Sequence, residues 1–108
     1  MKNNYKLQSL ILPEGAPLTL LDLTNSTALQ SLTLTNLPNL TDKNLILSGC
    51  NSLTSLTIDN CPLLSNINLA NLPKLKNLTI KNCKTLINLE SEEHPSLTSL
   101  IIEDCPNL

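Results

Sequence analysis

The stretch that decides the fold is "LTSLTIDNCPLLSNINLANLPKLKNLTIKNCKTL", residues 53–86, which gives one pattern three times. Each copy has a leucine, two residues, an aliphatic residue, one residue and a second aliphatic residue. A corner of asparagine followed by cysteine or leucine comes next. The copies begin every eleven residues. Self-similarity at a fixed short period is typical of a solenoid, in which neighbouring units bury each other's apolar rows.

The same unit extends over almost the whole chain of 108 residues. Its first positions are Leu7, Leu18, Leu29, Leu40, Leu53, Leu64, Leu75, Leu86, Leu97 and Leu108. Only one spacing departs from eleven, because thirteen residues separate Leu40 from Leu53. We therefore expect a single domain over residues 1–108, with a short N-terminal lead-in at 1–6 and repeats at 7–108.

Each unit is expected to form one short strand and one corner. Its fourth to sixth positions alternate aliphatic, polar, aliphatic, which is the pattern of a half-buried strand. Ser91 is the one sixth position that is not aliphatic. The strands are followed by residues that tolerate a left-handed backbone at corners. These are Asn25, Asn36, Gly49, Asn60, Asn71, Asn82 and Asp104.

Eleven residues make one side of a coil, so a closed coil takes two units. The expected fold is a β-rich repeat solenoid with coils of about 22 residues, built from two 11-residue strand units, with two parallel sheets and little helix. Sheet A takes every second unit, beginning with the one at Leu7, and sheet B takes the others. The extra residues before Leu45 should bulge from the B side.

Two units resemble a known family. The stretches "LTSLTIDNCPLL" (53–64) and "LTSLIIEDCPNL" (97–108) are similar to the short cysteine-containing repeats of the leucine-rich repeat family. Such repeats occur in plant nucleotide-binding resistance receptors and in bacterial repeat proteins. The resemblance covers residues 7–108 and implies a strand-lined solenoid. It implies a function only weakly, because one fold hosts many functions.

Composition excludes several classes of partner. The net charge is −2, and the seven basic residues form no dense patch with aromatic neighbours, so nucleic-acid binding is not expected. No stretch approaches the roughly 20 apolar residues that span a bilayer, so no membrane partner is expected. The opening "MKNNYKLQSLILPEGA" has too short an apolar run for a signal peptide and already carries the repeat. The compartment stays open.

The cysteines are interpreted as structural. Cys61, Cys83 and Cys105 are 22 residues apart and so form one column, while Cys50 lies on the opposite side. A metal site needs converging ligands, but the chain has no C-x-x-C pair and only one histidine, His94. We expect buried thiols and no cofactor. Parallel stacked side chains also suit disulfide geometry badly.

The segment "LESEEHPSL", residues 89–97, places Glu90, Glu92 and Glu93 beside His94. Paired carboxylates near a histidine suggest acid–base chemistry. However, the sequence offers no nucleophile or oxyanion donor with them, and a solvated loop is the better interpretation. We do not expect an enzyme.

The outward positions of sheet A form a candidate binding face for a protein partner. They are Ser31, Thr33, Ser55, Thr57, Asp59, Asn77, Thr79 and Lys81. This face has no Trp, Tyr or Arg, the residues in which binding hot spots are enriched. Its hydroxyl rows also resemble ice- or polysaccharide-binding solenoids, a minor alternative, since Thr is simply favourable on a solvated strand.

The ends of the solenoid are the second candidate contact. Solenoids usually need polar caps, and the expected end residues are aliphatic instead. They are Leu10, Leu12, Leu97, Leu100, Ile102 and Leu108. Either the sequence is an excerpt of a longer array, or its molecules stack head to tail into a filament. The sequence leaves both alternatives open.

Overall fold

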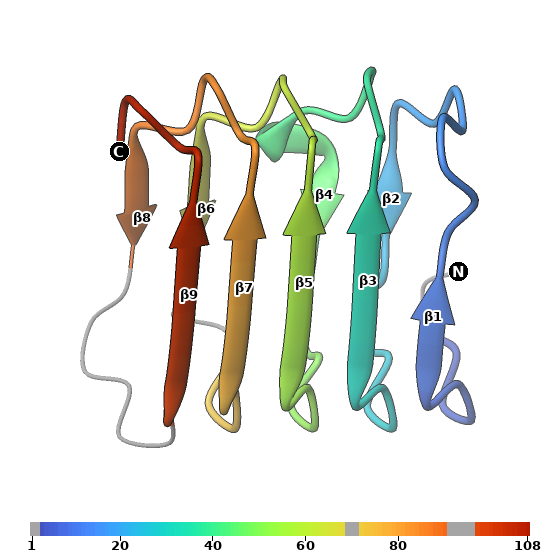
Figure 1. Ribbon diagram of the computed structural model, residues 1–108. Helices are drawn as coiled ribbons and strands as arrows, with labels where there is room; N and C mark the ends of the chain where they lie inside the picture. Colours follow the sequence, from blue (N-terminus) through green and yellow to red (C-terminus); the bar gives the residue numbers. More distant parts are fainter. Residues whose placement is uncertain (1–2, 69–71, 91–96) are drawn as a thin grey trace.

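A computed structural model of the chain describes residues 3–68, 72–90 and 97–108. They form a β-solenoid of about four turns, as the sequence predicts. The strands are β1 (Ser9–Ile11), β2 (Leu21–Asp22), β3 (Ser31–Thr35), β4 (Leu45–Ile46), β5 (Ser55–Asp59), β6 (Asn66–Asn68), β7 (Asn77–Lys81), β8 (Asn88–Glu90) and β9 (Ser99–Glu103). The odd-numbered strands lie side by side, with the even-numbered strands behind them (Figure 1).

Sheet A is a five-stranded parallel sheet in the order β1-β3-β5-β7-β9. Equivalent residues of neighbouring strands are 22 positions apart, as in the pairing of Ser55 with Asn77. The pairing of Ser31 with Ser55 is the exception, with a step of 24. These registers confirm that a coil consists of two eleven-residue units and that every second unit supplies a strand to sheet A.

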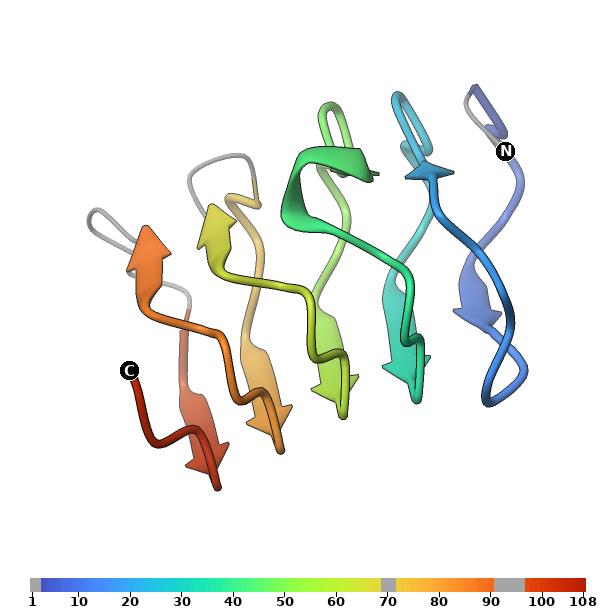
Figure 2. The ribbon, with the colours of Figure 1, turned by 90° about the horizontal axis from the view of Figure 1, so that it is seen from above.

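Strands on the B side are shorter and pair in two groups, β2 with β4 and β6 with β8. The residues inserted before Leu45 form a short 3-10 helix, η1 (Asp42–Asn44), directly ahead of β4. The insertion therefore lies on the B side, as expected, and sheet A continues past it in register (Figure 2). Within the described ranges, no helix has the length and apolar character needed to cross a membrane.

The core is a set of aliphatic columns between the two sides. Leu32, Leu56 and Leu78 stand at one register position of sheet A, and each is at most 1% exposed. The smallest dimension of the molecule is 19 Å, as two strand layers with their outer side chains require. Leucine and isoleucine at repeated positions suit this interior, because each coil offers the next a similar surface.

The corners depend on left-handed residues. Positive φ angles occur at Asn25 (59°), Asn36 (53°), Gly49 (79°), Asn60 (55°), Asn82 (55°) and Asp104 (54°). This confirms the predicted corners, except Asn71, which lies outside the described residues. The short polar side chains also bridge coils, since Asn60 Nδ2 donates to Asn36 Oδ1 at 2.6 Å. Asparagine therefore allows the turn and links it to its neighbour.

Gly49 provides a test of the corner geometry. A Cβ there would lie 2.3 Å from Asn25 Oδ1 and 3.1 Å from Asn25 Cα, while a Cβ on Gly15 meets nothing within 4 Å. Both glycines have positive φ, so Gly15→Ala should cost about 1 kcal/mol from backbone strain alone. Gly49→Ala should cost roughly 1–2 kcal/mol more because Asn25 must move. Urea unfolding measures both, and equal losses would contradict the close contact.

Candidate interaction surface

The outward face of sheet A consists of three columns set by the parallel register. Ser31, Ser55 and Asn77 occupy the first column. Thr33, Thr57 and Thr79 occupy the second, and Thr35, Asp59, Lys81 and Glu103 the third. The structure thus brings together all eight residues of the predicted binding face. Of the eight, Asn77 is exposed, and the other seven are half-buried.

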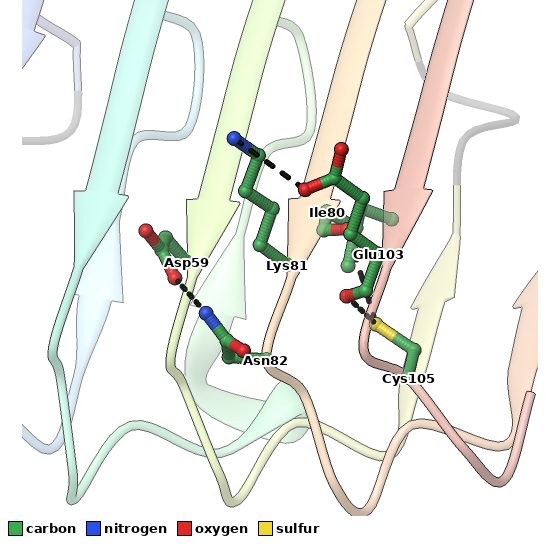
Figure 3. Close-up of polar contacts among 6 residues, drawn as sticks. All are labelled: Asp59, Ile80, Lys81, Asn82, Glu103 and Cys105. Carbon is green, nitrogen blue, oxygen red and sulfur yellow. Dashed lines mark hydrogen bonds and ion pairs between the residues drawn. The ribbon is translucent and has the colours of Figure 1, made fainter.

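The charged residues Asp59, Lys81 and Glu103 stand together in the third column (Figure 3). Lys81 Nζ lies 3.8 Å from a carboxylate oxygen of Glu103, and both side chains are substantially exposed. Asp59 accepts a hydrogen bond of 3.0 Å from Asn82 Nδ2. An exposed ion pair contributes little to stability. These groups are therefore available to set the specificity of a contact without being needed for the fold.

A shallow hollow of about 660 Å³ runs along the corners at the end of these strands. Its lining residues are Asn36, Asp59, Asn60, Asn82, Lys84, Asp104 and Pro106. Several of these residues are predicted from the sequence as turn formers, but the hollow that they line together is not predicted. The available signal was their equal spacing, which places each one beside its counterpart in the next coil.

The two edges of sheet A differ in how well their aliphatic residues are covered. In β9, Leu100 is 51% exposed and Ile102 is 37% exposed, and Leu108 beyond it is also exposed. Leu10 and Leu12 at the β1 edge, and Leu97 before β9, are half-buried against the core. The structure therefore places the predicted end residues at opposite edges, with the greater exposure at β9.

All four cysteines are free thiols, and three form the expected column. Cys61 and Cys83 are completely buried, while Cys105 is half-exposed. Each thiol lies against a backbone carbonyl, as Cys83 Sγ does at 3.3 Å from Lys81 O. Burial raises the pKa of the Cys83 thiol to about 11, and a backbone hydrogen bond with Cys61 opposes the increase. Burial also raises the pKa values of Cys50 and Cys61.

Buried thiols with raised pKa values are poor nucleophiles and poor metal ligands, since both roles need the thiolate. Over the residues that the structure describes, no group of three or more His, Cys, Asp or Glu side chains could hold a metal ion. Ser91, Glu92, Glu93 and His94 lie outside those residues, as does the side chain of Glu90. The sequence-based interpretation of that segment stays a prediction.

Comparisons with known proteins do not extend these observations. No family model, no curated protein and no solved structure matches the chain. The candidate functional features are therefore the outward face of sheet A and the two edges of that sheet.

Thiol counting tests the cysteine column. Cys105 is the one half-exposed cysteine, so native protein at pH 8 should show one readily reacting thiol in a colorimetric disulfide-exchange assay. Cys50, Cys61 and Cys83 are fully buried and should react only as fast as the protein opens. Cys105→Ser should remove the rapid reaction. If one thiol per chain still reacted rapidly in that variant, the burial of the other three cysteines would be contradicted.

The raised pKa of Cys83 has a consequence for stability. Its pKa of about 11 in the folded state lies above the ordinary thiol value of 9.0, so the folded state holds the thiol proton more tightly. The resulting stabilisation is complete below pH 9 and is lost as the pH rises through 11. The free energy of unfolding in urea should fall by about 1 kcal/mol or more from this group between pH 8 and 10.5. In the Cys83→Ala variant, the free energy of unfolding should fall less over this pH range. If the variant showed the same pH dependence as the native chain, Cys83 would not be its cause.

Proposed function

We propose that this chain is a non-catalytic repeat scaffold for protein–protein interaction, of the leucine-rich repeat kind, and that the uncovered β9 end is its main contact. The exposure of β9 carries this proposal. Leu78 and Ile80 in β7 are 1% and 0% exposed, whereas the equivalent residues of β9, Leu100 and Ile102, are 51% and 37% exposed. The difference arises because β9 pairs with β7 on that side, whereas no described residue packs on the outer side of β9.

Two physical effects favour binding at the β9 end. Its aliphatic side chains gain free energy when covered, on the order of 1 kcal/mol for each half-exposed Leu or Ile. The outer edge of β9 also offers backbone donors and acceptors to a further strand. A partner that supplies an extended segment with aliphatic residues at alternate positions satisfies both effects.

The polar face of sheet A serves this scaffold as a second, weaker contact surface. Its hydroxyl columns and the Asp59, Lys81 and Glu103 charges favour orientation and specificity over affinity. The absence of Trp, Tyr and Arg from its eight predicted contact positions supports that division of roles. Ice or polysaccharide binding remains the minor alternative, because the threonine column of Thr33, Thr57 and Thr79 adjoins the charged third column.

An alternative function is that of a structural subunit, in which the β9 end receives the β1 edge of another copy. Such a contact joins two different surfaces and does not close on itself, so its repetition builds a filament. The parallel order of sheet A favours this alternative, since its two edges run in the same direction and one sheet continues through the junction.

Charged substitutions at the β9 end test the proposed function. The probe is a fluorescein-labelled peptide with the sequence of residues 29–40, LQSLTLTNLPNL, which carries the repeat's aliphatic pattern. Its fluorescence anisotropy should show saturable binding to the native chain. Leu100→Lys with Ile102→Lys should weaken that binding at least about tenfold, because two ammonium groups would have to be desolvated.

Thr57→Lys is the matched control, because it adds a charge to the open face and leaves the β9 edge unchanged. This variant should bind the peptide like the native chain, and circular dichroism should show all three proteins folded. Equal affinity for the native chain and the double lysine variant would refute the β9 end as the contact.

A further inference from the structure

The middle column of the outward face has an unusual composition at its ends. In register order across sheet A it contains Ile11, Thr33, Thr57, Thr79 and Ile101. The three inner strands carry threonine, and both edge strands carry isoleucine. Ile11 is 71% exposed and Ile101 is 42% exposed. The only aliphatic residues of this column therefore stand at its two edges and face solvent.

The two edge strands also match each other in sequence. Ser9–Ile11 and Ser99–Ile101 both read Ser-Leu-Ile. Leu10 and Leu100 occupy the same register position, directed at the core, and Ile11 and Ile101 occupy the next one, directed outward. If the two edges met, serine would face serine, leucine would face leucine and isoleucine would face isoleucine. No pair in that set brings charges together.

We propose that β9 of one copy of this chain pairs in parallel with β1 of a second copy, joined on the open face by Ile101 against Ile11. This inference rests on the proposed role of the β9 end and names its partner. In the junction the two isoleucines become cross-strand neighbours about 4.8 Å apart and shield each other from water. Leu100 is covered at the same time by the coil that begins with Leu7.

A second copy accounts for both edges of the described chain, as a further coil of a longer array also would, whereas an unrelated partner at one edge does not. An unrelated protein bound to β9 would cover Ile101, but it would leave Ile11, the more exposed of the two isoleucines, in contact with solvent. Pairing of β9 with β9 of another copy in one continuous sheet would be antiparallel, because the two-fold axis perpendicular to the sheet reverses one strand, and Ile11 would again stay uncovered. Pairing of β9 with β1 keeps the parallel direction. It ends near Leu12, since Pro13 has no N–H to donate.

The first experiment returns each edge to the residue found in the inner strands. Ile11→Thr and Ile101→Thr reproduce the threonine of the inner strands, so both variants should fold. In sedimentation velocity, the native chain should gain average mass with concentration, and each variant should associate about tenfold more weakly. The control is Ile87→Thr, which makes the same change at a residue that is 65% exposed and lies outside sheet A. It should associate like the native chain.

The second experiment blocks one edge at a time and then mixes the variants. Ile101→Lys should block the β9 edge and Ile11→Lys the β1 edge, so each chain alone should be monomeric. An equimolar mixture should form a one-to-one dimer, because each variant keeps the edge that the other lacks. A pairing of like edges cannot give this result.

The outcomes separate this inference from the proposed function. A native chain that stays monomeric at millimolar concentration overturns the self-association, and so does a mixture that forms no dimer. Association that Ile101→Lys abolishes and Ile11→Lys leaves unchanged also overturns it. In each case, peptide capture by β9 would still support the proposed function, and loss of that capture would remove the basis of both.

Discussion

The described structure depends on a chain that changes direction about every eleven residues, with η1 as the one helical turn among the described residues. Few backbones permit so tight a corner, and here the corner is made with residues at positive φ. Asparagine suits this position because its short polar side chain lowers the cost of a left-handed backbone and reaches a neighbour. Asn60 does both, with its φ of 55° and its hydrogen bond to Asn36.

Equal coil length follows from equal corners, and the strand register follows from equal coil length. Sheet A keeps its register where a coil gains two residues, because η1 takes them up on the other side. The B side has short strands in separate pairs and so loses little by accepting them. One side of the solenoid is therefore the ordered surface, and the other absorbs variation in the sequence.

Periodicity was sufficient to predict the strands of sheet A, the left-handed corners and the burial of Cys61 and Cys83. Each of these depends on a residue's place within its own unit, which the sequence displays directly. The corner hollow becomes visible only when the corners of successive coils are compared, and no position within a single unit marks that β4 and β6 do not pair. Likewise, Leu10 and Leu100 occupy the same place in their units, but Leu10 is half-buried against the core and Leu100 is 51% exposed.

The constant register also bears on how the chain finds this fold. Each pairing in sheet A closes a loop of 22 or 24 residues, whichever two neighbouring strands are involved. The entropy lost in closing such a loop depends on its own length and not on the length of the chain. Folding can therefore start at any adjacent pair of coils and grow coil by coil. Parallel sheets usually fold slowly because their pairings are distant in sequence, and this architecture keeps that separation fixed however many coils are joined.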